Sequence, residues 1–339
     1  MKLLATLSLV FLATAATAAD TLHIYTWADY LNPALVKRFE KEHSCKVKID
    51  TFDSNEAMYA RLKAGASGYD LIFPSSYIIP LMVSQDMLQP LDHEKIPNLK
   101  NVNAEVLDKI ADKEMKHSAP YTFGYAVIGY RKDKVKSLDA TWQTFARTDL
   151  KKRVTLLDDM RETIGAGLKS LGYSLNTRDE KQLAEARDVV IGWKKHISKF
   201  DNEGYKAGID SGEFFVVHGY SGDLWQVMQN NKKVAVVIPK EGVSASCDEM
   251  VIPKTAPNPA LALAMINFIL DGKNSAENME NIGYMCPNTE GLKKVSKDFL
   301  KNPAVTIPEE VKAKAEVIQD LGDDLKKYTK IWDEIKAAQ

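Results

Sequence analysis

The segment Leu22-His23-Ile24-Tyr25-Thr26-Trp27-Ala28-Asp29-Tyr30-Leu31-Asn32-Pro33 decides the fold. Its first four residues are typical of a short strand, and Asn32 followed by Pro33 is a favoured start for a helix. Residues 46–52 then alternate in the strand pattern, a helix follows Ser54, and residues 69–73 form a further apolar run. The order strand, helix, strand, helix, strand predicts a parallel, doubly wound sheet.

The middle of the chain repeats this pattern. Strands are predicted at 154–157, 214–217 and 234–238, with helices between them. Residues 249–252 and the apolar run 260–270 predict a strand and a buried helix that return the chain to the first sheet. A chain of 339 residues also exceeds the usual size of a single core. We therefore expect an α/β fold with two doubly wound lobes.

The first eighteen residues have the pattern of an export signal. Met1 and Lys2 provide a positive start, residues 3–12 are apolar, and Ala16-Thr17-Ala18 supplies the small residues of a cleavage site. The apolar run is too short to span a bilayer. The sequence thus predicts a signal peptide over residues 1–18 and a periplasmic mature chain, in which cysteines are allowed to form disulfides.

The composition argues against several classes of protein. A net charge of −1 offers no basic excess for the phosphates of a nucleic acid. Three cysteines permit one disulfide, and their spacing fits no zinc signature. The sequence contains no Gly-x-Ser-x-Gly elbow, no P-loop and no His-Glu-x-x-His motif. We expect neither an enzyme nor a protein with a bound cofactor or metal.

Polar and aromatic residues follow the predicted strands, where open parallel sheets bind their ligands. These strand-end segments are Trp27-Ala28-Asp29-Tyr30, Pro74-Ser75-Ser76-Tyr77, Asp158-Asp159-Met160-Arg161-Glu162, Tyr220-Ser221-Gly222-Asp223 and, after a loop, Cys247-Asp248. Carboxylates gathered in one cleft require a cation, and aromatic faces attract ammonium groups while they cover methylene chains. A flexible polyamine combines both features, so it is the predicted ligand.

Purely structural roles are also open to several of these residues. Asp159 and Glu162 stand where a helix N-terminus favours acidic side chains, and Asp223 is in the position of an N-cap. Trp27 and Tyr77 could be core aromatics. A metal is the rival ligand for the carboxylates, but they lie on separate strand ends without a compact oxygen-rich loop. Their coincidence at strand ends of both lobes favours a ligand site.

Over nearly the whole mature chain, the sequence closely resembles the periplasmic polyamine-binding proteins of bacterial uptake systems, which include spermidine- and putrescine-binding members. The resemblance is carried by Tyr25-Thr26-Trp27-Ala28-Asp29-Tyr30, Ser54-Asn55-Glu56-Ala57-Met58-Tyr59-Ala60, Tyr69-Asp70-Leu71-Ile72, Pro74-Ser75-Ser76-Tyr77, Asp158-Asp159-Met160-Arg161-Glu162, Pro239-Lys240-Glu241-Gly242 and Ile282-Gly283-Tyr284.

The resemblance implies a type II periplasmic-binding-protein fold, whose two lobes are joined by hinge strands and close on the ligand. It assigns residues 19–124 plus 247–292 to the first lobe and 125–246 plus 293–339 to the second. By motif, Asp248 is the main amine-binding carboxylate. The whole set of ligand-binding residues that we expect is Trp27, Asp29, Ser76, Tyr77, Asp159, Glu162, Tyr220, Asp223, Asp248 and Tyr284.

The chain also departs from the family pattern. Ser246 stands where a bulky aromatic residue is usual, Tyr220 where many members have Trp, and Ala28 where they have Ser or Thr. Acidic positions of the spermidine and the putrescine types occur together, which leaves spermidine, norspermidine and putrescine open as ligands. Because Cys247 adjoins Asp248 and Cys286 closely follows Tyr284, we expect a Cys247–Cys286 disulfide near the site.

The resemblance implies a monomeric transport receptor that delivers a polyamine to a membrane ABC permease. The alternative is a polyamine sensor of the same fold that docks on a membrane signalling protein. Both roles require hinge closure without chemistry.

Overall fold

The computed structural model describes residues 20–338, so the predicted signal peptide lies outside the described residues. The first part of the chain forms the elements that its sequence predicts. Asn32 accepts a hydrogen bond from the Ala34 amide, and Ser54 accepts one from the Ala57 amide, which confirms both predicted helix caps. The elements are β1 (Thr21–Thr26), α1 (Pro33–His43), β2 (Lys46–Thr51), α2 (Asn55–Lys63), β3 (Leu71–Ile72), α3 (Ile79–Ser84) and α4 (Ala104–Leu107).

The middle of the chain again alternates strands and helices. The strand predicted at 214–217 begins later, as β7 (Val216–Tyr220), whereas the helix predicted after Asp159 begins at the next residue. The elements are β5 (Val154–Leu156), α5 (Met160–Ser170), α6 (Glu180–Lys194), β6 (Lys199–Phe200), α7 (Gly204–Ser211), β7 (Val216–Tyr220), α8 (Ser221–Asn230) and β8 (Val234–Val237).

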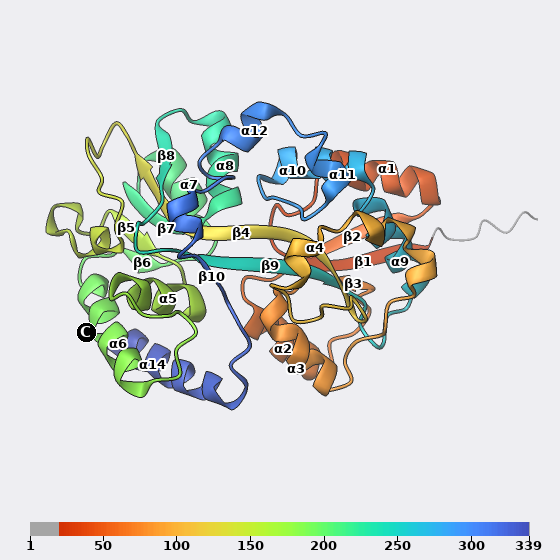
Figure 1. Ribbon diagram of the computed structural model, residues 1–339, viewed down its shortest axis with the longest axis horizontal. Coiled ribbons are helices and arrows are strands. Elements are labelled where there is room, and N and C mark those ends of the chain that lie inside the picture. Colours follow the sequence, from red (N-terminus) through yellow and green to blue (C-terminus); the bar gives the residue numbers. More distant parts are fainter. Residues whose placement is uncertain (1–19, 339) are drawn as a thin grey trace, which may run out of the picture.

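Two long strands, β4 (Ser118–Arg131) and β9 (Ser244–Val251), run through the centre of the molecule (Figure 1). The sequence predicted neither the first of them nor the full length of the second. Residues 118–125 of β4 pair with β9, and residues 126–131 pair with β7 and β8. The strand order is β2-β1-β3-β9-β4-β7-β5-β6, with β10 (Glu316–Val317) beside β9 and β8 beside β4.

The sheet is parallel on both sides of these central strands. β1 pairs in parallel with β2 and β3, and β5 pairs in parallel with β6 and β7. β4 and β9 run antiparallel to their partners in these sets. The expected parallel arrangement is therefore confirmed, with two antiparallel strands added between the sets.

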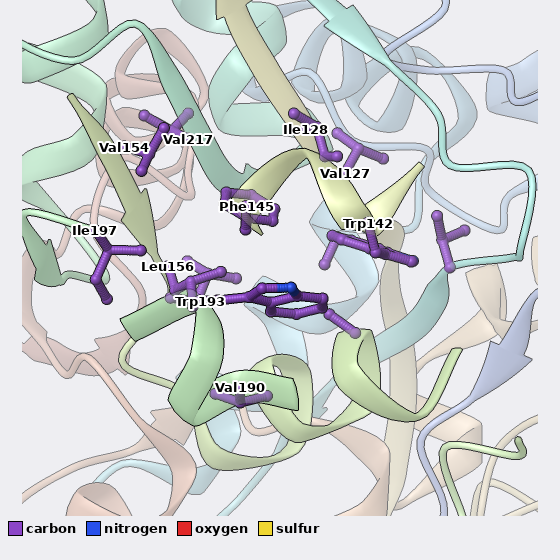
Figure 2. Packing of buried hydrophobic residues seen from close by; sticks show 14 of the residues in the cluster. Val127, Ile128, Trp142, Phe145, Val154, Leu156, Val190, Trp193, Ile197 and Val217 are labelled. Carbon is purple, nitrogen blue, oxygen red and sulfur yellow. The ribbon is translucent and has the colours of Figure 1, made fainter. Parts of the chain in front are cut away.

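The buried apolar side chains form separate clusters. One, here the first core, draws on residues 22–121 and 250–284, and another, the second core, draws on residues 126–243 and 307–335. Figure 2 shows part of the second core around Trp193, whose ring centroid lies 5.8 Å from that of Phe145. Each set of parallel strands thus carries its own core.

The last part of the chain returns to both sets of strands. α9 (Pro259–Ile269), which covers the predicted apolar run up to its last residue, packs in the first core, and α14 (Leu325–Ala337) packs against α5 and α6. No helix within residues 20–338 is long and apolar enough to cross a membrane. The remaining elements are α9 (Pro259–Ile269), α10 (Gly272–Ile282), α11 (Thr289–Leu292), α12 (Lys297–Lys301), α13 (Glu309–Lys312) and α14 (Leu325–Ala337).

The predicted Cys247–Cys286 disulfide is wrong, because all three cysteines are free. Phe123 of β4 pairs with Cys247 on one side and forms a β-bridge to Met285 on the other. The backbone of β4 therefore lies between the two segments, whose Cα atoms are about two strand spacings, or roughly 10 Å, apart, beyond the roughly 7 Å limit between bridged Cα atoms.

We expect a thiol reagent to titrate three groups per chain when the mature protein is unfolded in denaturant without a reductant. Burial raises the pKa of Cys286 to about 12 and that of Cys247 well above its ordinary value, so both thiols should react slowly before unfolding. A reagent count of one would show that two of the cysteines are bridged.

Candidate functional site

A cavity of about 80 Å³ lies where the two sets of strands meet. Its walls contain six carboxylates and one ammonium group, together with aromatic rings. The lining residues are Trp27, Ala28, Tyr30, Phe52, Asp53, Asn55, Ser75, Tyr77, Gly124, Asp159, Glu162, Asn202, Glu203, Lys206, Tyr220, Asp223, Ser246, Asp248, Tyr284 and Ile318.

Asp248 is a buried carboxylate on β9. It accepts a hydrogen bond of 2.6 Å from the Tyr30 hydroxyl and another of 2.6 Å from the Ser75 hydroxyl. Burial, and to a smaller degree the nearby charge of Asp159, raises the pKa of Asp248 to about 6. Two neutral hydroxyls therefore orient this carboxylate, and neither of them neutralises it.

Asp159 and Glu162 stand at the start of α5. Asp159 caps the helix through a 3.0 Å hydrogen bond from the Glu162 amide, and its other oxygen accepts from the Tyr220 hydroxyl at 3.3 Å. Asp159 therefore both caps the helix and faces the cavity. Burial and the charge of Asp159 raise the pKa of Glu162 to about 8, and Ser244 donates a hydrogen bond to its carboxylate.

Arg161 is the buried cation nearest to this pair in sequence. Its guanidinium donates to the Gln319 carbonyl and to the Asn176 side chain, at 2.9 Å and 2.8 Å. It lowers the pKa values of Asp159 and Glu162 less than burial raises them. We name Asp159, Glu162 and Asp248 the deep acids. Glu162 and Asp248 are buried and Asp159 is half-buried. They affect one another's pKa values, and none forms an ion pair with a cation of residues 20–338.

Asp223 lies in the first turn of α8 and is not the N-cap, which is Tyr220. Its carboxylate accepts hydrogen bonds from the Tyr205 hydroxyl at 2.8 Å and the Tyr284 hydroxyl at 3.2 Å. The Lys206 ammonium lies 4.0 Å from the carboxylate of Asp223 and 2.8 Å from that of Asp29. Asp223 thus has a cation of the protein beside it, whereas the deep acids do not have one within the described residues.

The aromatic walls are fixed from behind. The Trp27 indole donates to the Phe73 carbonyl at 2.9 Å, and its ring centroid lies 4.4 Å from that of Phe52. The Tyr77 hydroxyl accepts a hydrogen bond from the Asn55 side-chain amide and donates one to the Glu56 carboxylate, each at 3.1 Å. Rings held in this way can cover an apolar chain without losing further rotamer freedom.

Of the ten residues predicted from the sequence, the cavity brings together Trp27, Tyr77, Asp159, Glu162, Tyr220, Asp223, Asp248 and Tyr284. Two predicted residues do not line it. The Ser76 hydroxyl faces away and accepts from the Ala111 amide, whereas the preceding Ser75 takes the cavity position. The carboxylate of Asp29 is 68% exposed and stays at the rim, bound to Lys206.

The sequence prediction also missed residues that the cavity contains. Tyr30 and Ser75 fall within the quoted strand-end segments, so the segments were right although the individual residues were not chosen. Lys206 gave no signal of this kind, because it stands in a helix within a lysine-rich chain. Residues 20–338 contain no group of three or more His, Cys, Asp or Glu side chains placed to hold a metal ion.

The chemistry of the cavity favours a cation with apolar segments. Six carboxylates and one ammonium line the cavity, and burial makes the ionised forms of Glu162 and Asp248 costly until a cation enters. The hydroxyls and rings between the carboxylates suit a chain of methylene groups that carries several nitrogens.

Comparison with known proteins agrees with this picture. The sequence model for the bacterial extracellular solute-binding protein matches residues 34–307. A putrescine/cadaverine-binding protein of Pseudomonas aeruginosa is 34% identical over 99% of each chain. Spermidine/putrescine-binding periplasmic protein 1 of Haemophilus influenzae is 33% identical over 96% of this chain and 91% of that protein.

A solved structure shows the same fold. The putative spermidine/putrescine ABC transporter structure from Listeria monocytogenes superposes with a TM-score of 0.88, at 35% identity, over 95% of this chain and all of that chain. The predicted type II periplasmic-binding-protein fold is therefore confirmed.

Proposed function

The chain belongs to the bacterial extracellular solute-binding protein family, whose members are binding components and not enzymes, and on this premise we propose that it captures a polyamine in the central cavity and delivers it to an ABC transporter. The three deep acids, which line the cavity and have no paired cation within the described residues, are the observation that carries the proposal. The names of its relatives, which include putrescine and spermidine, support the same ligand class.

The ligand's nitrogens would bind the deep acids, and its methylene groups would lie against Trp27, Tyr77, Tyr220 and Tyr284. Several hydrogen-bonded hydroxyls already hold the carboxylates in place, so binding loses little side-chain entropy. Ser246 lines the cavity as a small side chain and contributes no ring to its wall.

Closure of two lobes would enclose the ligand. Residues 19–124 plus 247–292 would form the first lobe, and residues 125–246 plus 293–339 the second. The change of β4 from β9 to β7 between Tyr125 and Ala126 supports a hinge at this boundary. The separate first and second cores support two bodies that move relative to each other.

The predicted signal peptide and the periplasmic relatives support a periplasmic location. The solved Listeria monocytogenes structure is described as part of an ABC transporter, which supports delivery to a permease over docking on a sensor. A strain that lacks this chain should take up labelled polyamine more slowly, and uptake should return when the gene is restored. Unchanged uptake in that strain would contradict the transport role.

We expect polyamine affinity to fall as the pH is lowered from about 8 towards 5. Glu162 and Asp248 have pKa values of about 8 and about 6, so in the empty protein they become neutral over this range and lose their attraction for ammonium groups. The loss should reach about tenfold per pH unit for each linked proton. Calorimetric Kd values at several pH values check this.

The empty protein should show the opposite trend in stability. A raised carboxyl pKa means that the folded chain keeps protons that the unfolded chain releases above pH ~4.5, so the free energy of unfolding falls as the pH rises towards about 8. The increase in Tm caused by a polyamine should accordingly be larger at pH 8 than at pH 6. Glu162→Gln should flatten the upper part of both profiles, and pH-independent affinity in the unaltered protein would contradict the assignment.

A further inference from the structure

Lys206 is the one cation among the cavity-lining residues of the described chain. It lies on α7, and its side chain is 18% exposed. The ammonium is 2.8 Å from the Asp29 carboxylate and 4.0 Å from that of Asp223. Lys206 therefore places an ammonium inside a cavity whose other charged groups are all carboxylates.

The position of this ammonium is built into the fold. Asp201 accepts hydrogen bonds from the amides of Glu203 and Gly204 and so fixes the start of α7. The next residue, Tyr205, is buried, and its hydroxyl joins the Asp223 carboxylate to the Tyr220 amide. The helix that presents Lys206 is thus anchored to the same carboxylate that Lys206 approaches.

Lys206 remains charged at neutral pH. Burial alone would lower its pKa, but the carboxylates of Asp223 and Asp29 outweigh this effect and raise the pKa above its ordinary value. The nearby Glu203 carboxylate, also on the cavity wall, acts in the same direction. A free ammonium group that approached Asp223 would meet a fixed positive charge at the distance of an ion pair.

We propose that the Lys206 ammonium takes the place of a ligand nitrogen beside Asp223, so that the cavity selects diamines over triamines. The inference rests on the proposed polyamine function. The deep acids would hold the nitrogens of a short ligand, such as putrescine or cadaverine. A longer ligand, such as spermidine, would place a further ammonium against Lys206 and lose affinity through repulsion.

The contrast between the two ends of the cavity supports this assignment. Asp159, Glu162 and Asp248 are oriented by hydroxyls and amides, and no ammonium of residues 20–338 lies within ion-pair distance of them. Asp223 has hydroxyl partners of the same kind and, in addition, Lys206. The protein therefore supplies the cation beside Asp223, whereas the ligand would supply the cations beside the deep acids.

The test compares Lys206→Met with the unaltered protein by calorimetric titration with putrescine and with spermidine. Methionine keeps most of the length of the side chain and removes the charge. We expect the unaltered protein to prefer putrescine, and the variant to shift the ratio of the two Kd values towards spermidine by about tenfold or more, because Asp223 gains a charged hydrogen-bond partner only from the longer ligand.

Lys232→Met is the matched control. Lys232 is exposed just beyond the end of α8, the helix that carries Asp223, and within the described residues its ammonium donates only to the Met228 carbonyl. This variant should have the same ratio of putrescine Kd to spermidine Kd as the unaltered protein. Lys206→Gln repeats the test with a polar, uncharged side chain if the methionine variant does not fold.

Three results have distinct meanings. If both Lys206 variants still bind and their ratio of the two Kd values stays within about twofold of that of the unaltered protein, the inference is overturned and the polyamine function stays intact. A similar change in affinity for both ligands would also overturn it, since it would mean that Lys206 only stabilises the closed form through Asp29. If the unaltered protein bound no polyamine, the proposed function itself would fail.

Discussion

Asp248→Asn is expected to weaken polyamine binding by roughly 3–5 kcal/mol, or about two to nearly four orders of magnitude in Kd. The substitution keeps the shape of the side chain but removes the charge that would face a ligand ammonium. Tyr30 and Ser75 each donate to this carboxylate at 2.6 Å, and an asparagine has only one oxygen to accept from them. Calorimetric titration at pH 8, where Asp248 is ionised in the empty protein, measures the loss.

Asp86→Asn is the control for a general charge effect. Asp86 is 81% exposed and pairs with Lys254 at 3.0 Å, away from the cavity lining. An exposed pair of this kind contributes little, so this variant should bind as the unaltered protein does. Equal losses in both variants would show that the affinity depends on total charge and not on the deep acids.

Trp193→Ala is expected to lower the free energy of unfolding by roughly 3–5 kcal/mol, because it leaves a large hole in the second core. The Trp193 side chain is 1% exposed and packs with Phe145 and the surrounding apolar residues in Figure 2. Urea denaturation of the empty protein measures the change, and the Kd of the remaining folded protein should stay close to that of the unaltered protein.

Leu171→Ala is the control for this substitution. Leu171 follows α5 and is 36% exposed, so its loss should change the free energy of unfolding by only about 0.5 kcal/mol. A small effect of Trp193→Ala would mean that the second core does not depend on this ring. A large loss of affinity in the same variant would mean that the core and the cavity are more strongly coupled than their separate residues suggest.

Much of the fold could be predicted because its signals are local. The caps at Asn32 and Ser54 fix the starts of α1 and α2, and the alternating residues 46–52 mark the strand before α2. β4 was missed because Pro120, Gly124 and Gly129 interrupt its pattern and its partners lie far away in sequence. Cys247 and Asp248 were expected near a loop, but they lie inside β9, whose two faces are both largely buried and give no alternation.

The candidate site was predictable to the level of segments. The strand-end rule located the segments that contain Asp159, Glu162 and Asp223, since parallel strands deliver their ends to one edge. It could not choose between Ser75 and Ser76, because which side chain faces the cavity depends on a turn that follows β3. Lys206 escaped detection because a lysine on a helix usually points to solvent, and only the structure brings it beside Asp223.

The most direct test of the central claim is calorimetric titration of the purified mature protein, at pH 8, with putrescine, cadaverine, spermidine, norspermidine, spermine and agmatine. Uncharged 1,4-butanediol serves as the matched control, since it has the length of putrescine without its charges. We predict one binding site per chain for at least one polyamine and no heat from the diol. Binding of no polyamine, or equal binding of the diol, would contradict the account.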